Sequence, residues 1–399
     1  MNSRERVLAA LRHEEPDRIP LDIGATESSG ITGIAYGRLT RHLGLEGATR
    51  LFDPMGQLAL VEDAVLNEFG ADCVPLHFEP RAWKPSTLGD GSPCEVPQRW
   101  NETFLPDGSR EVRDEDGRLA ARMPSGGLYY ETGDPPLAAL AGAAQVDPEA
   151  PCIRGFDLPG FSDECWVERR ERAKALHATG RAVVGNLMCH FLAAGQILRG
   201  YEQFMCDLIG EKALAHALLD ALCEAYLDRI ETYLTTLGEW LDVVLVNDDL
   251  GTQAGPMLSP ALYREMIKPY QRRLFGVIRD RFDGVLLMHS CGAVSEFIPD
   301  LIECGVQAIN PVQLSAAGME PERLKREFGG DVAFWGGGCD TQRVLNQGTP
   351  DDVRREVRRN CAALAPGGGF VFTQVHNIQP DVPPENIVAM VEALREVTP

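Results

Sequence analysis

The sequence of 399 residues predicts an α/β protein, a (β/α)8 barrel (TIM barrel) with a β-rich insertion in its N-terminal half. From about residue 180, short runs that are apolar throughout alternate with long amphipathic stretches. Strands of this kind alternating with helices indicate a parallel sheet covered on both faces. No glycine-rich phosphate loop follows the first apolar run, which disfavours an open doubly wound sheet. We therefore expect residues 1–399 to form a single barrel domain.

The expected barrel strands can be placed in order along the chain. Six strand–helix units occupy the C-terminal part, and two further strand candidates lie near the start, so that eight strands are available to close a barrel. The two early runs are "RIPLDIG" (18–24) and "DCVPLHF" (72–78), and the six later ones are "AVVGNL" (182–187), "DVVLVNDD" (242–249), "GVLLMHSCG" (284–292), "VQAINPVQ" (306–313), "VAFWGGG" (332–338) and "FVFTQVHN" (370–377).

Residues 79–155 interrupt this alternation of predicted strands and helices. The turn signals "LPDGS" and "DEDG" stand between short alternating runs, a pattern typical of β-hairpins. A Pro-rich segment, "GDPPLAALAGAAQVDPEAP", then leads back to the helical part. We expect a β-rich insertion in one barrel loop, not an independent domain.

Composition limits the function classes. A net charge of -21 argues against nucleic-acid binding, which needs a basic surface. No apolar run approaches the roughly 18 residues of a membrane helix, and the first residues lack the apolar core of a signal peptide. Eleven irregularly spaced cysteines without an export signal do not indicate a disulfide framework. We expect a cytoplasmic enzyme with neither nucleic-acid nor membrane partners.

Two soft metal donors stand at the end of one predicted strand. His289 and Cys291 are two residues apart, and side chains at that spacing point to the same face of a strand. Cys339 ends the strand two units later, so it can converge with them across the barrel mouth. One imidazole and two thiolates leave an open position in a tetrahedral zinc site, as expected for a catalytic metal. The same cysteines are also compatible with core packing or with a redox pair.

Other polar residues also fall where strands end, which is where a barrel of this kind carries its active site. Asp248 and His376 are the predicted catalytic residues; the alternatives are a loop anchor for Asp248 and a satisfied loop histidine for His376. Glu27 follows the first strand and is both a substrate-binding candidate and a candidate fourth metal ligand. The remaining predicted substrate-binding residues are Asn186, Asp249, Asn310 and Asn377.

With these residues identified, the chain resembles the uroporphyrinogen decarboxylase superfamily over nearly its whole length. The resemblance is carried by "RERVLAALRHEEPDRIP", "SPALYREMIKPY", "HSCGAVSEFIPDLIECGVQAINPVQ", "FWGGGCDTQ" and "VHNIQPDVPPENIVAM". True decarboxylases carry an arginine-rich segment after the first strand, whereas this chain has "LDIGATESSG" there, without arginine. The zinc methyltransferases of the superfamily have an H-x-C-G pattern and a later cysteine, which His289, Cys291, Gly292 and Cys339 match. Asp248 is the counterpart of an aspartate of the decarboxylases.

The resemblance implies a zinc-dependent methyltransferase that works with a corrinoid protein. The methyl group would move between that protein and a small methyl donor or acceptor: a thiol, tetrahydrofolate, or a methoxy or methylamine compound. The chain contains no D-x-H-x-x-G cobalamin motif, so a separate corrinoid protein would have to present the methylcobalamin. Two alternatives remain open at this point, a uroporphyrinogen-type decarboxylase and a non-catalytic barrel that binds a ligand.

Overall fold

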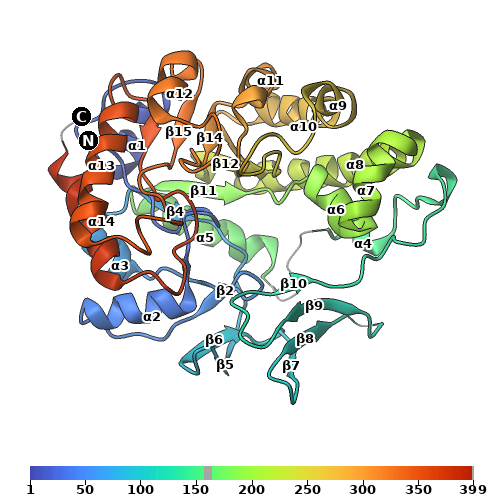
Figure 1. The fold of residues 1–399 in the computed structure, drawn as a ribbon, viewed down its shortest axis with the longest axis horizontal. Coiled ribbons are helices and arrows are strands. Elements are labelled where there is room, and N and C mark those ends of the chain that lie inside the picture. The colour runs from blue at the N-terminus through green and yellow to red at the C-terminus, as the bar shows by residue number, and fades with distance from the viewer. Residues whose placement is uncertain (115, 157–163, 398–399) are drawn as a thin grey trace.

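The computed structural model describes residues 1–114, 116–156 and 164–397. Within these ranges, seven parallel strands form one curled sheet in the order β16-β15-β14-β13-β12-β11-β4 (Figure 1). Their bounds are β4 Cys73–Pro75, β11 Ala182–Asn186, β12 Val243–Asn247, β13 Val285–His289, β14 Ala308–Asn310, β15 Ala333–Trp335 and β16 Phe370–Val371. Each lies inside one of the predicted apolar runs.

The remaining barrel position is filled by a short segment around Leu21, between the two edge strands. Leu21 forms a parallel bridge with Phe372 beyond β16, and the Asp22 amide donates to the Phe372 carbonyl (2.8 Å). On its other side, the Asp72 amide next to β4 donates to the Leu21 carbonyl (2.8 Å). The sheet is thereby closed, which confirms the predicted α/β barrel.

Helices cover the outside of the sheet, as the amphipathic stretches predict (Figure 1). The large apolar core lies between these helices and the strands. In chain order the helices are α1 Ser3–Leu11, α2 Gly33–His42, α3 Asp63–Phe69, α4 Pro151–Arg154, α5 Trp166–Ala178, α6 Leu192–Arg199, α7 Tyr201–Gly210, α8 Lys212–Leu237, α9 Pro260–Met266, α10 Lys268–Arg281, α11 Ile298–Glu303, α12 Pro321–Phe328, α13 Pro350–Leu364 and α14 Pro384–Glu396. Short 3-10 turns lie at Ala143–Gln145, Gly238–Trp240 and Ser295–Phe297.

A second apolar core fills the inside of the barrel. Its members come from every strand of the parallel sheet, and Val7 and Leu11 of α1 join them. Helix α1 therefore closes the amino-terminal end of the barrel. Asn2 begins this helix with a reciprocal capping arrangement with Glu5, which satisfies two otherwise unpaired amide groups. With that end closed, the barrel opens at the carboxyl ends of its strands, where the predicted functional residues lie.

Residues 83–132 form antiparallel strands beside the barrel, in the lower part of Figure 1. Strands β5 (Trp83–Thr87) and β6 (Pro93–Pro97) pair as one hairpin. A four-stranded sheet follows, in the order β10-β9-β8-β7, made of β7 Glu102–Phe104, β8 Arg110–Arg113, β9 Leu119–Met123 and β10 Glu131–Thr132. A small sheet of β1 Ile31–Thr32, β3 Leu58–Ala59 and β2 Leu51–Asp53 lies nearby in the sequence. An apolar cluster joins the insertion to α2 and β2 through Ile34 and Leu51.

The helices within the described ranges are each too short or too polar to span a bilayer.

Candidate metal centre at the barrel mouth

His289 is the last residue of β13, and Cys291 follows it at the barrel mouth. The Cys291 sulfur lies 3.4 Å from His289 Nε2, so the two donors face one another as the spacing predicts. Burial raises the pKa of the Cys291 thiol well above its usual value, and the adjacent Asp249 carboxylate raises it further. A thiolate at this position therefore needs a neighbouring cation to stabilise it.

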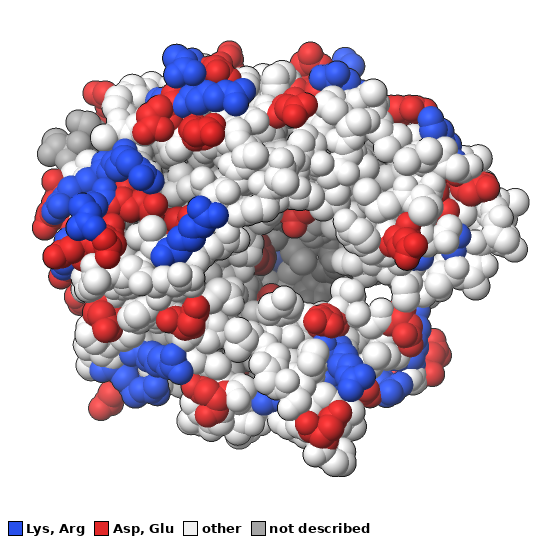
Figure 2. Space-filling view, viewed as in Figure 1, with Lys and Arg blue, Asp and Glu red and all other residues white. Residues whose placement is uncertain are grey.

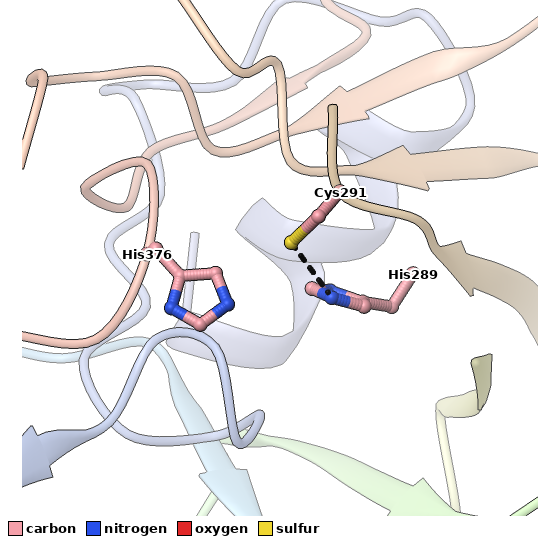
Figure 3. A group of neighbouring side chains, drawn as sticks. All are labelled: His289, Cys291 and His376. Atoms are coloured by element: carbon pink, nitrogen blue, oxygen red, sulfur yellow. Dashed lines mark hydrogen bonds between the residues drawn. The ribbon is translucent and has the colours of Figure 1, made fainter. Parts of the chain in front are cut away.

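His376 is the third member of this group (Figure 3). It lies beyond the end of β16, and its ring centroid is 6.0 Å from that of His289. One ligand atom from each of His289, Cys291 and His376 lies within 4.8 Å of the other two. Burial lowers the pKa of His376 to about 4, helped by the proximity of His289, so its imidazole is neutral at physiological pH. A neutral imidazole is the form that binds a metal ion.

The donor set fits a zinc ion. Two imidazole nitrogens and one sulfur are ligands that zinc prefers, and three protein ligands leave a position for substrate or water. The geometry supports this fit, because the Cys291 sulfur and His289 Nε2 already face one another at 3.4 Å.

Asp249 is the carboxylate beside this group. Its Oδ1 accepts a hydrogen bond from the Cys291 amide (2.8 Å) and lies 3.7 Å from His289 Nε2. The Asp249 side chain is half exposed. Predicted as a substrate-binding residue, Asp249 is thus placed at the rim of the mouth with one oxygen facing the group of donors.

Asn310 ends β14 and lies directly behind His289. Its Oδ1 is 2.6 Å from His289 Nδ1 and also accepts a hydrogen bond from Ser28 Oγ (2.6 Å). Its Nδ2 donates to the Trp335 carbonyl (2.9 Å). Asn310 is fully buried, so it supports a side chain of the mouth and does not line the open surface. Its predicted role in substrate binding stays a prediction.

Glu27 and Asn186 form another polar part of the mouth. The Asn186 amide donates to Glu27 Oε2 (2.7 Å), and the Asn377 side chain donates to the Glu27 carbonyl oxygen. Asn247 donates to Asn186 Oδ1 (3.0 Å) and pairs in register with His289 on the next strand. Burial raises the pKa of Glu27. Figure 2 shows a hollow in this face of the molecule with acidic side chains on its wall.

Cys339, the predicted third ligand, is not part of the group of donors. It is fully buried, and its sulfur donates to Glu356 Oε2 (3.4 Å) on α13, outside the barrel. The prediction assumed that the alternation of a strand continues to residue 339. Strand β15 ends at Trp335, and Gly336 and Gly337 then adopt φ values of 93° and 89°, which redirect the chain. Only the Cys339 carbonyl faces the loop of His376, where it accepts from the Val375 amide (2.9 Å).

Asp248 is also placed differently from the prediction of a catalytic residue. It is buried, and its carboxylate accepts hydrogen bonds from the amides of Phe191, Leu192 and Ala193 at 2.9–3.1 Å. Gln271 Nε2 also donates to it (3.3 Å). The carboxylate therefore holds the start of α6 and is not directed at the group of donors. A strand-end carboxylate alone does not reveal this role, because the amides come from a distant loop.

Two residues of the site were not predicted from the sequence. Ser28, which shares the Asn310 oxygen with His289, lies within "ATESSG", where nothing distinguishes it from a loop serine. Asp53 lies close enough to Glu27 to raise the pKa of that carboxyl by its charge, a smaller effect than that of burial. No local signal marked Asp53, because its proximity to Glu27 joins two segments that are separate in the sequence.

Comparisons with known proteins agree with this fold. Residues 170–397 match the model of the family described as uroporphyrinogen decarboxylase (URO-D). A uroporphyrinogen decarboxylase of Legionella pneumophila (strain Paris) is 24% identical over 68% of this chain and 74% of its own length. One from Chromohalobacter salexigens is 26% identical over the same shares. A solved methyltransferase from Methanosarcina mazei is 18% identical, with a TM-score of 0.61 over 99% of both chains. Because the match to the family model covers more than half of the chain, the chain belongs to the uroporphyrinogen decarboxylase (URO-D) family.

Proposed function

We propose that the protein is a zinc-dependent methyltransferase that moves a methyl group between a corrinoid protein and a small methyl donor or acceptor. The observation that carries the proposal is the convergence of His289, Cys291 and His376 at the barrel mouth. The fold shared with the Methanosarcina mazei methyltransferase is compatible with it. In this proposal His289, Cys291 and His376 hold the zinc, and His376 replaces Cys339 in the predicted ligand set.

Bound zinc would supply Lewis acidity, either to a thiol that accepts the methyl group or to the methoxy oxygen or amine that releases it. The chain itself must remove the Cys291 thiol proton for the ligand set to form. Asp249 would be the group that passes this proton to solvent once a cation stabilises the thiolate, because its carboxylate lies beside the thiol and is half exposed. The His289 and His376 rings, with centroids 6.0 Å apart, would supply the two nitrogen ligands.

The Glu27 side of the mouth is proposed to bind the small substrate. Asn186 and Asn377 hold Glu27 from two directions, so its carboxylate is pre-positioned. A methyl donor or acceptor bound beside Glu27 would lie among these polar side chains of the mouth. In the proposal, a corrinoid protein would present its methylcobalamin at the barrel mouth, where His289, Cys291 and His376 would hold the zinc.

A decarboxylase is the second candidate, favoured by the names of the curated relatives. Against it, residues 21–30 at the barrel mouth contain no arginine and contribute Glu27. The carboxylates of a porphyrinogen would therefore meet another carboxylate where a cationic clamp is needed. A non-catalytic ligand-binding barrel is also disfavoured, because the strand-end donors converge and are not dispersed.

The test is a turnover assay on purified, zinc-loaded protein. Methylcobalamin is offered with a thiol or with tetrahydrofolate, and reduced cobalamin with methoxylated aromatics or methylamines, while the cobalamin absorbance is followed. Chelator-treated protein is the control, and uroporphyrinogen is offered separately. Methyl transfer that requires zinc is expected. Decarboxylation of uroporphyrinogen by both the zinc-loaded and the zinc-free protein, with no methyl transfer, would establish the second candidate instead.

A further inference from the structure

The hydrogen-bond partners of the Asn310 side-chain amide fix its orientation. Its Nδ2 faces the carbonyl oxygen of Trp335 at 2.9 Å, and a carbonyl can only accept a hydrogen bond. The NH2 group must therefore be on that side. The Oδ1 atom is consequently the one that lies 2.6 Å from His289 Nδ1 and 2.6 Å from Ser28 Oγ.

Because Asn310 Oδ1 can only accept hydrogen bonds, it determines which nitrogen of the His289 ring carries the proton. In the neutral ring one nitrogen carries the proton and the other carries the lone pair. Since Asn310 Oδ1 requires a donor, the proton of His289 must be on Nδ1. The lone pair is then on Nε2, which is the nitrogen that faces the Cys291 sulfur at 3.4 Å.

We infer that Asn310 is a positioning residue that holds His289 in the Nδ1–H tautomer and so presents its Nε2 lone pair to the metal. The inference rests on the proposed function for the identity of the ion, and it assigns to Asn310 a role other than substrate binding. Residues that accept a hydrogen bond from a metal-binding histidine orient its ring, and their loss typically weakens metal affinity by about 10–100-fold.

Ser28 offers a matched control at the same oxygen. Its hydroxyl donates to Asn310 Oδ1, so Ser28→Ala removes one of the two donors but keeps the acceptor that His289 needs. Asn310→Ala removes that acceptor. Asn310→Asp keeps an acceptor oxygen toward Nδ1 while losing the donor to the Trp335 carbonyl. The three variants therefore separate the effect on the tautomer from general damage to this buried network.

The first measurement is the tautomer of His289 in metal-free protein labelled with 15N-histidine, at pH 8, where imidazoles are neutral. A His289→Gln variant assigns its signals. The unmodified protein, Ser28→Ala and Asn310→Asp are expected to show protonated Nδ1. Asn310→Ala is expected to show a mixture of tautomers. A protonated Nε2 in the unmodified protein would overturn the inference, even if Asn310→Ala fails to fold.

The second measurement is zinc affinity by competition with a chromophoric chelator, with circular dichroism as the check on folding. Folded Asn310→Ala is expected to bind zinc about 10–100-fold more weakly, and Ser28→Ala within about threefold of the unmodified protein. Equal affinities for Asn310→Ala and the unmodified protein would contradict the positioning role. If the unmodified protein has no affinity for zinc, the proposed function fails, and the tautomer measurement still decides the role of Asn310.

Discussion

The rings of His289 and His376 lie at the barrel mouth with their centroids 6.0 Å apart and their planes at 65°. One side chain ends β13 and the other lies beyond the end of β16, so residues far apart in the sequence supply the two imidazoles. The Cys339 sulfur instead contacts Glu356 on the outer side of the sheet (3.4 Å). This arrangement distinguishes two ligand sets that share His289 and Cys291.

The first prediction compares the two candidates for the third ligand. His376→Ala is expected to lose stoichiometric zinc after dialysis, because only two protein ligands remain. Cys339→Ala is expected to retain zinc, because its sulfur does not lie in the group of donors. Metal content by mass spectrometry of both folded variants is the measurement. The opposite result, with zinc kept by His376→Ala and lost by Cys339→Ala, would restore the ligand set predicted from the sequence.

The second prediction concerns Asp248 as an anchor of α6. Asp248→Ala leaves the amides of Phe191, Leu192 and Ala193 without their acceptor, so the free energy of unfolding should fall by about 1–3 kcal/mol. Zinc content should not change. Urea unfolding followed by circular dichroism measures the loss, with the exposed Asp283→Ala as control. An unchanged stability combined with lost turnover would return Asp248 to a catalytic role.

The third prediction concerns pH and His77, which is buried and stacked on Phe52 with ring centroids 3.6 Å apart. Burial, with a smaller effect of Arg172, lowers its pKa from the usual 6.5 to about 3. The unfolded chain therefore binds more protons than the folded one between these values. The contribution of His77 is complete above pH 6.5 and is lost as the pH falls toward 3, at up to about 1.4 kcal/mol per pH unit.

His77→Phe keeps the stacking and removes this titration. Its unfolding free energy should therefore fall less between pH 7 and pH 5 than that of the unmodified protein, as measured by urea unfolding at both values. Subtracting the decrease measured for His77→Phe from that of the unmodified protein removes the contributions of other titrating groups, provided that these are the same in both proteins. An identical decrease in the two proteins would show that His77 does not carry the effect.

The fourth prediction concerns the turn after Cys291. Gly292 has a φ of 86°, and a Cβ atom there would lie 2.4 Å from the carbonyl carbon of Gly251. Gly292→Ala must therefore displace one of the two loops, which should lower the melting temperature and weaken zinc binding through Cys291. Gly255→Ala is the control, because its Cβ would meet no atom within 4 Å. Wild-type zinc affinity in Gly292→Ala would show that the contact does not position Cys291.

Much of the architecture could be predicted from the sequence by itself. The apolar runs are buried on both faces of the sheet, and this requirement is local enough to be visible in each run. His289 and Cys291 were predicted as a pair for the same reason, since one strand end carries both. The polar ends of β11 and β14, at Asn186 and Asn310, also followed from the strand pattern.

Only the tertiary structure decided which residues join that pair and what the polar residues do. Gly336 and Gly337 redirect the chain after β15, so the direction of the Cys339 side chain does not follow from strand alternation. The contacts of Asp248 with α6 and of Asn310 with His289 join segments brought together by closure of the barrel. Strand alternation determines side-chain direction only within a strand, whereas the loops at the barrel mouth obtain their geometry from neighbours that are distant in the sequence.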